Sequence, residues 1–346
     1  GLLPADEEIA GSLRSANVPV LIAVNKTDDR RAKDRALEFY RLGFEPVVEI
    51  AAEHGQGTGD LLDEVVKRLP TQSVRTAEAE PQEVAVAIVG RPNVGKSSLL
   101  NRLLKEERSI VSAMPGTTRD SVDAVLRWER RVFRIVDTAG IRRAGQIARS
   151  GQLEGVSVLL ARRAIEKADV TVIVIDSSQG VADQDATIAG EAEKAGSGII
   201  IAANKWDLMK GQGQDLYKKF DDELRRQIKF LDYAPVLHIS AATGERTTKL
   251  LEMIDKVADA RLRRVPTGEL NRFLKDVTAA HPPVSPGKKH VRILYAAQTS
   301  VAPPTFVFFT NIATEFHFSY ERFLANQLRE SFGLMGTPIR VKVRKS

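Results

Sequence analysis

Short apolar runs separated by longer mixed segments extend through most of the chain. The runs "VAVAIV" at 84–89, "VTVIVI" at 170–175 and "IIIAA" at 199–203 are apolar at nearly every position. Such runs are typical of strands buried on both faces of a parallel sheet. Each is far shorter than the roughly 20 apolar residues of a membrane-spanning helix. The pattern therefore predicts an α/β fold with a doubly wound, mostly parallel sheet and no membrane span.

The periodicity changes after Arg264, where a unit of a different type begins. Two stretches with helical spacing alternate with three strand-like runs, in the order helix, strand, strand, helix, strand. In the last run, apolar positions alternate with Arg340, Lys342 and Arg344, which makes one strand face basic. We predict a small α+β domain, and we expect its core to include the aromatic residues Phe306, Phe308, Phe309 and Phe316.

The chain contains an internal repeat. Residues 1–28 align without a gap on residues 180–207, at an offset of 179, and both segments end in N-K-x-D. A glycine-bounded loop begins at Gly90, which is 90 residues before the second segment. By the same spacing, we expect the first copy to have such a loop upstream of Gly1, so that this chain holds a first domain truncated at its N-terminus.

These patterns divide the chain into four expected parts. Residues 1–70 form the C-terminal part of a first domain, 71–83 an acidic linker, 84–262 a complete second domain, and 263–346 the α+β domain. The linker has no apolar periodicity, so we expect a solvated, extended tether that lets the domains rearrange.

Composition limits the chemistry that the chain can perform. It has 43% hydrophobic and 28% charged residues, five scattered histidines and no cysteine. Disulfides and thiolate metal sites are excluded, and a histidine metal cluster is not expected. The lack of cysteine fits a reducing compartment, so we expect a cytoplasmic protein.

The net charge of +6 is concentrated near the C-terminus. From Arg263 onward, 13 Lys or Arg accompany 5 Asp or Glu, whereas the first 262 residues contain 38 basic and 40 acidic residues. This local excess favours a polyanionic partner such as RNA, although a solvated basic surface explains it equally well.

The loop from Gly90 to Ser97 fits G-x-x-x-x-G-K-[ST] between a predicted strand and a predicted helix. In this motif, backbone N–H groups and the helix N-terminus bind phosphate oxygens. Lys96 would reach the β- and γ-phosphates, and the Ser97 hydroxyl would bind Mg²⁺.

Further elements follow in the order that a GTP site requires. The segment "DTAG" would bring Asp137 to the metal and the Gly140 N–H to the γ-phosphate. The segment "NKWD" would let Asp207 accept hydrogen bonds from N1–H and the N2 amine of guanine. Adenine lacks both donors and would leave the carboxylate unpaired, so it would be rejected.

These motifs resemble those of the bacterial Der (EngA) family of GTPases, which are related to translation factors. The resemblance covers essentially the whole chain and rests on "GRPNVGKSSLLN", "PGTTRD", "DTAGI", "NKWD", "SA" and residues 316–345. It implies tandem P-loop GTPase domains followed by a C-terminal KH-like domain. It also implies a GTP-hydrolysing switch in biogenesis of the large (50S) ribosomal subunit, whose nucleotide state controls domain arrangement and the binding of rRNA.

The residue directly after D-T-A-G cannot assist hydrolysis in this chain, so another group must do so. Many small GTPases have a glutamine there that orients water, which Ile141 cannot do. The resemblance implies K⁺, held partly by Asn93 and by backbone carbonyls around Thr117 and Thr118, in place of an arginine finger. Arg119 is the alternative finger. The resemblance also assigns Mg²⁺ to Thr118 rather than Thr117.

The expected site residues follow from these motifs. The catalytic residues would be Lys96, Asn93, Thr118 and Gly140, with Mg²⁺ on Ser97, Thr118 and Asp137 and K⁺ on Asn93. GTP or GDP in the complete domain would contact Gly90, Arg91, Pro92, Asn93, Val94, Gly95, Lys96, Ser97, Ser98, Asp137, Thr138, Ala139, Gly140, Ile141, Asn204, Lys205, Trp206 and Asp207, and the backbone N–H groups of Ser240, Ala241 and Ala242. The first copy would use Asn25, Lys26, Thr27, Asp28, Ala51 and Ala52.

Alternatives remain open for the function and for the tail. Gly333-Leu334-Met335-Gly336 fits the G-x-x-G clamp of KH domains, but it joins a helix to a strand, which favours a helix C-cap and turn.

A GTP-binding RNA scaffold with negligible turnover is the alternative to a hydrolytic switch. A tRNA-modification GTPase is less favoured because of the tandem repeat. We expect a monomer that binds rRNA on the large subunit and no DNA.

Overall fold

A computed structural model describes residues 2–15, 20–27, 37–68, 83–105, 112–113, 123–141, 154–209, 215–283 and 290–345. Most of the predicted linker lies outside these ranges, as do Asp28, Thr117, Thr118 and Arg119. Within the described residues, no helix has both the length and the apolar character of a membrane-spanning segment.

The complete domain is built on a sheet with the strand order β4-β5-β6-β3-β7-β8-β9. Strands β3, β6, β7, β8 and β9 are parallel, and β4 and β5 add an antiparallel edge. This confirms the predicted α/β fold with a mostly parallel sheet. The strands are β3 (Glu83–Val89), β4 (Ser112–Ala113), β5 (Ala124–Trp128), β6 (Arg131–Ile135), β7 (Val170–Asp176), β8 (Gly198–Asn204) and β9 (Val236–His238).

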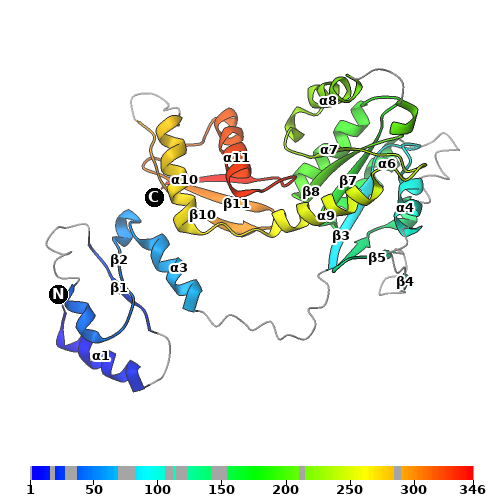
Figure 1. Ribbon diagram of the computed structural model, residues 1–346. Coiled ribbons are helices and arrows are strands. Elements are labelled where there is room, and N and C mark those ends of the chain that lie inside the picture. Colours follow the sequence, from blue (N-terminus) through cyan, green and yellow to red (C-terminus); the bar gives the residue numbers. More distant parts are fainter. Residues whose placement is uncertain are drawn as a thin grey trace.

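Helices cover both faces of this sheet (Figure 1). One core includes residues of α4 (Lys96–Lys105) and α9 (Thr247–Leu262), and the other includes residues of α6 (Glu154–Glu166), α7 (Asp183–Ala195) and α8 (Leu216–Gln227). Short 3-10 helices η3 (Trp206–Met209) and η4 (Lys229–Leu231) complete the domain.

The two cores explain why the central strand is apolar from its second residue onward. Val86 and Ile88 of β3 face the core that includes α4 and α9, whereas Ala87 and Val89 face the core that includes α6, α7 and α8. Successive strand residues point to opposite faces, so a strand covered on both sides has no solvent-facing positions. The continuous apolar run in the sequence is therefore the direct result of this layered arrangement.

The C-terminal domain has the predicted order of elements: α10 (Thr267–Ala280), β10 (Ile293–Val301), β11 (Pro304–Thr310), α11 (Phe318–Phe332) and β12 (Arg340–Lys345). Its sheet has the order β10-β11-β12, with β10 antiparallel and β12 parallel to β11. The two helices lie on the same side of this sheet (Figure 1). Their buried residues form one core with the sheet, which includes Leu270, Leu274, Phe306, Phe308, Leu324 and Leu328.

One of the four aromatic residues expected in this core lies elsewhere. Phe306, Phe308 and Phe316 are buried in it, as predicted. Phe309 is on the opposite face of β11, because successive strand residues point to opposite faces. There its ring stacks on Tyr295, with centroids 4.3 Å apart and an interplanar angle of 7°. The expectation for Phe309 was therefore wrong.

The Gly-Leu-Met-Gly loop is a helix C-cap and turn, as the sequence favoured. Gly333 ends α11 in the left-handed region, and its N–H donates to the Arg329 carbonyl oxygen. The Gly336 carbonyl oxygen accepts a hydrogen bond of 2.7 Å from the Ile199 N–H at the start of β8. The loop is therefore part of the contact between the C-terminal domain and the complete domain.

Arg340 of β12 reinforces this contact. Its guanidinium donates to the carbonyl oxygens of Glu193 at 2.6 Å and Lys194 at 2.9 Å, which are at the C-terminal end of α7. It also pairs with the Glu193 carboxylate at 3.1 Å. The basic face predicted for β12 is thus divided, because Arg340 binds the neighbouring domain while Lys342 and Arg344 are exposed.

The N-terminal segment reproduces part of the complete domain. It consists of α1 (Pro4–Ser15), β1 (Ile22–Val24), η1 (Leu37–Leu42), β2 (Val47–Glu49), η2 (Ala52–His54) and α3 (Thr58–Arg68). Strands β1 and β2 are parallel, and Ile22 pairs with Val47 as Ile201 pairs with Val236 in β8 and β9. Helix α3 approaches α10 (Figure 1), where the Gly268 N–H donates to Asp63 Oδ2 at 3.3 Å.

Candidate nucleotide-binding site

The loop between β3 and α4 passes very close to the ends of the neighbouring strands. Gly90 and Gly95 have φ angles of 147° and 99°. A Cβ at Gly90 would lie 2.3 Å from the Val174 carbonyl oxygen, and one at Gly95 would lie 2.3 Å from Asn204 Nδ2. Asn93 has a φ of 64°, which asparagine adopts more readily than most residues, and its side chain is exposed. Only glycine fits the two close approaches.

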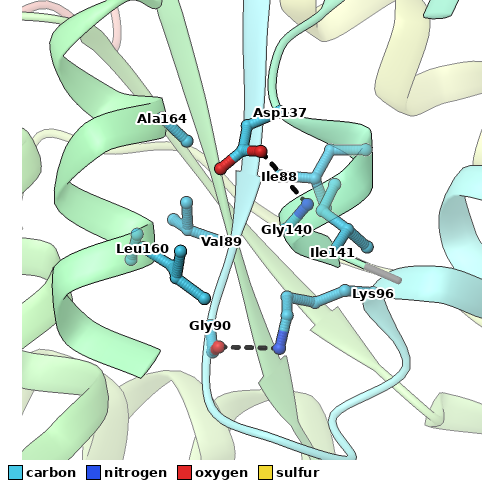
Figure 2. A pocket seen from close by; sticks show the side chains of 10 residues that line it. Ile88, Val89, Gly90, Lys96, Asp137, Gly140, Ile141, Leu160 and Ala164 are labelled. Atoms are coloured by element: carbon cyan, nitrogen blue, oxygen red, sulfur yellow. Dashed lines mark hydrogen bonds between the residues drawn. The ribbon is translucent and has the colours of Figure 1, made fainter. Parts of the chain in front are cut away.

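Lys96 begins α4, and its ammonium group points back to the loop (Figure 2). Its Nζ donates to the carbonyl oxygens of Gly90 at 2.8 Å and Arg91 at 2.6 Å. Burial lowers the pKa of Lys96 to about 8, although the charge of Asp185 acts in the opposite direction. Because an adjacent anion favours the charged form, a bound phosphate would raise this pKa again.

The turn after β6 lies on the other side of Lys96 (Figure 2). Asp137 Oδ1 accepts a hydrogen bond of 3.1 Å from the Gly140 N–H, and the Ser97 hydroxyl donates to the Ile141 carbonyl oxygen at 3.3 Å. A cavity of about 30 Å³ lies between the loop, this turn and α6. The groups expected to bind Mg²⁺ and the γ-phosphate are thus engaged with the protein itself in this structure.

The donor types at this position fit the expected cations. The Ser97 hydroxyl and the Asp137 carboxylate would supply oxygen, the ligand type that Mg²⁺ prefers. No group of three or more His, Asp or Glu in the described ranges could hold a metal by itself. Asn93 is exposed, and its side-chain amide has a carbonyl oxygen, the type of ligand that coordinates K⁺.

Asn204 connects the phosphate loop to the loop after β9. Its side chain is buried, with 2% exposed. Nδ2 donates to the Val94 carbonyl oxygen at 2.8 Å, and Oδ1 accepts from the Ala241 N–H at 2.9 Å. Both ends of the amide therefore bind the protein, and Asn204 joins the two loops.

Asp207 has a buried acceptor atom to which no described residue donates. Its Oδ1 is inaccessible to solvent and without a hydrogen-bond partner in the described ranges. Such an atom is unfavourable in a folded protein unless a donor reaches it, and a ligand could supply that donor only after the side chain or its surroundings move to expose the atom. The preceding Trp206 is buried, and its ring centroid lies 4.1 Å from that of His238, which fixes the backbone beside Asp207.

Two of the three backbone N–H groups expected to meet the base oxygen are already used. The Ser240 N–H donates to the Glu245 carbonyl oxygen at 3.1 Å, and the Ala241 N–H donates to Asn204. These bonds form the loop, so they are unavailable to a ligand in this arrangement. The Ala242 N–H is the remaining candidate of the three.

The first copy has the same loop geometry. The Ala51 N–H donates to the Gln56 carbonyl oxygen at 2.9 Å, as Ser240 does to Glu245, and the Ala52 N–H donates to Asn25 Oδ1 at 3.0 Å. Lys26 and Lys205 share a left-handed backbone, with φ of 65° and 63°. The replacement of Ser240 by Ala51 therefore leaves the backbone bonds unchanged, and Thr27 is buried beside them.

Sequence reasoning missed Asp176, which ends β7. Its Oδ2 forms an ion pair of 2.6 Å with Lys205 Nζ. Burial alone would raise the pKa of Asp176, but hydrogen bonds from Lys205 and Ser178 hold it below its usual value. The sequence signal that could have identified Asp176 is an acidic residue directly after the run "VTVIVI". The strands that precede the phosphate loop and "NKWD" have their C-terminal ends at the same edge of the sheet.

Comparisons with known proteins agree with this architecture. A family model described as "KH-domain-like of EngA bacterial GTPase enzymes, C-terminal" matches residues 264–344. A model described as "50S ribosome-binding GTPase" matches residues 85–205, and the "Elongation factor Tu GTP binding domain" model matches residues 158–260.

Three curated relatives are similar over nearly the whole chain. GTPase Der of Moorella thermoacetica is 48% identical over 345 residues, which are 100% of this chain and 77% of the relative. GTPase Der of Desulfitobacterium hafniense is 46% identical, covering 99% of this chain and 76% of the relative. GTPase Der of Bacillus cytotoxicus is 45% identical, covering 99% and 78%.

Proposed function

The chain belongs to the GTPase Der family, and we propose that it is a nucleotide-controlled switch in assembly of the large ribosomal subunit. As a member of this family it is a GTPase that binds GTP and GDP. We propose that residues 84–262 are the complete GTPase domain and residues 263–346 the KH-like domain. Residues 1–70 would be part of a first GTPase domain, and 71–83 the linker between the two.

We propose that Asp207 recognises guanine, and its buried, unpartnered Oδ1 is the observation that carries the proposal. Guanine presents N1–H and an N2 amine side by side, so it can donate to a fixed carboxylate, whereas adenine cannot. Asn204 would act indirectly, by holding the phosphate loop against the base-contact loop.

We propose that the phosphates lie against the loop from Gly90 to Ser97, with Lys96 as their principal charged contact. Ser97, Thr118 and Asp137 would hold Mg²⁺, which neutralises charge on the phosphates. For this to occur, the Ser97 hydroxyl and the Asp137 carboxylate must exchange their present partners, Ile141 and Gly140, for ligand atoms. The Gly140 N–H would then be free to donate to the γ-phosphate.

K⁺ is proposed as the source of the additional positive charge during hydrolysis. Ile141 has 7% of its surface exposed and carries no polar side-chain atom that could orient water. The Asn93 side chain, exposed on a left-handed residue of the loop, would hold the cation beside the phosphates, together with carbonyl groups near Thr118. A cation there would stabilise the charge on the transferred phosphoryl group.

The proposed partner is rRNA of the large subunit. Support comes from the ribosome-binding family model and from the basic C-terminal domain, in which Lys342, Arg344 and Lys345 are exposed on β12. Binding through such residues would be electrostatic, so it should weaken strongly as salt increases.

Phosphate release in K⁺ buffer, with 50S particles, 30S particles or none, tests the proposal. Sedimentation with each particle in GDP or a non-hydrolysable GTP analogue measures binding in parallel. The proposal expects turnover and binding to 50S particles that depends on the nucleotide. Binding to 50S particles without measurable turnover would instead favour the RNA scaffold, and equal binding to both subunits in both nucleotide states would contradict the switch.

A further inference from the structure

The side chain of Arg91, the second residue of the phosphate loop, contacts the start of α7 and the segment before it. Arg91 Nε lies 2.8 Å from Asp185 Oδ2, near the start of α7. Its Nη2 donates to the Gly180 carbonyl oxygen at 3.0 Å. The Arg91 side chain has 17% of its surface exposed, and that of Asp185 has none. The loop is therefore joined to α7 by a nearly buried ion pair.

Asp185 has more than one contact in this environment. Its Oδ2 also accepts a hydrogen bond of 3.0 Å from the Ala182 N–H, which caps the first turn of α7. Its Oδ1 is buried and has no hydrogen-bond partner in the described ranges. Burial raises the pKa of Asp185, while the Ala182 N–H and the charges of Arg91 and Lys96 oppose that rise.

Helix capping alone does not account for the ion pair. In the first copy Asp6 occupies the position equivalent to Asp185, and its Oδ2 accepts a hydrogen bond of 2.9 Å from the Leu3 N–H. The cap is thus formed there without any described arginine at the carboxylate. In the complete domain the same carboxylate also binds Arg91, and its charge acts on Lys96.

We propose that Asp185 and Arg91 act together as positioning residues for nucleotide binding. Asp185 holds the Arg91 guanidinium out of the phosphate cradle, and Arg91 neutralises Asp185 so that Lys96 remains available to the phosphates. The inference rests on the proposed function, because it requires the loop from Gly90 to Ser97 to bind phosphate.

Replacing Arg91 or Asp185 by an uncharged side chain should have different effects on nucleotide binding. R91Q would leave a buried carboxylate without its cation, and that carboxylate would attract Lys96 and repel phosphate. D185N would remove the negative charge and would leave the cationic Arg91 beside the cradle. Removing both charges should therefore weaken GDP binding less than removing Arg91 alone.

The experiment measures GDP affinity by titration calorimetry, and kcat and KM for GTP, in wild type, R91Q, D185N and R91Q/D185N. We expect R91Q to weaken GDP binding by about tenfold or more, since an uncompensated buried charge is strongly unfavourable, and mainly to raise KM. The double variant should return to within about threefold of wild type. A double variant as weak as R91Q, or weaker, would overturn the proposal.

Matched controls separate this inference from folding defects and from the proposed function. D6N removes the equivalent capping carboxylate in the first copy and should leave GDP affinity unchanged. If R91Q does not fold, R91Q/D185N decides, because it buries no unpaired charge: it should bind within about threefold of wild type, and a larger loss would overturn the proposal. If wild type itself binds no guanine nucleotide, the proposed function fails first.

Discussion

Replacement of Asn204 by alanine tests whether one buried amide holds the two halves of the site together. In the native protein the amide donates to the Val94 carbonyl oxygen at 2.8 Å and accepts from the Ala241 N–H at 2.9 Å. N204A would leave both backbone groups without their partner. Both loops would then lose the connection that fixes the phosphate cradle relative to the base-contact segment.

The size of the effect follows from the burial of this amide, which is 2% exposed. Leaving a buried polar group unpaired costs about 1–3 kcal/mol, so two groups give an upper range of about 2–6 kcal/mol. If half of this appears as lost nucleotide affinity, GDP should bind about 5- to 150-fold more weakly. The remainder should lower the melting temperature, by roughly 2–4 °C per kcal/mol in a domain of this size.

Titration calorimetry with GDP and thermal melts of N204A, N204D and N25A make the comparison. N204D keeps an acceptor for Ala241 but places an oxygen against the Val94 carbonyl, so it should be at least as weak as N204A. N25A changes the equivalent but exposed Asn25 and should not alter binding to the complete domain. If N204A binds GDP within about twofold of wild type and melts at the same temperature, the bridging role is refuted.

Further predictions concern cations, pH and the domain contact. GTP hydrolysis should be faster in K⁺ than in Na⁺, and N93A should remove the difference; equal wild-type rates in both salts would exclude the K⁺ mechanism. Because Lys96 has a pKa of about 8, GDP affinity should be steady below pH 7 and fall above pH 8, and K96M should bind weakly with no such fall. The stability of the nucleotide-free protein should show the opposite trend, rising from pH 8 toward the unfolded pKa of 10.5, because neutral lysine is easier to bury. G336A should lower the melting temperature more than G333A. The Cβ added by G336A would lie 2.7 Å from the packed Val257 side chain, whereas that added by G333A would lie 2.6 Å from the flexible end of Arg263. Equal shifts in melting temperature would contradict a tight contact between the Gly336 turn and the complete domain.

The fold could be predicted largely because the strands are buried on both faces. Continuous apolar runs predicted β3, β7 and β8, and the repeat predicted that the strand in residues 1–28 matches β8. The structure adds that β1 and β2 pair in the same register as β8 and β9. Phe309 was misplaced because the run from Phe306 to Phe309 is apolar at every position, so composition could not assign its alternate residues to two different faces.

The candidate site was less predictable, because its polar contacts join residues that are far apart in the chain. The motif identified Asn204 as a base-site residue, but its bonds to Val94 and Ala241 depend on how three loops meet. The ion pair of Arg91 with Asp185 was likewise hidden, since no local spacing relates a loop residue to a helix 94 positions later. Such contacts arise from the sheet topology that brings the strand ends together.

We propose that Asp207 selects guanine through its buried carboxylate. Calorimetry of wild type and D207N with GDP, XDP and ADP tests it directly, because xanthine has an oxygen acceptor in place of the guanine N2 amine. Wild type should prefer GDP by about 100-fold or more, and D207N should prefer XDP, since an amide can donate where the carboxylate could only accept. Undiminished GDP binding by D207N, or equal binding of ADP and GDP by wild type, would contradict the account.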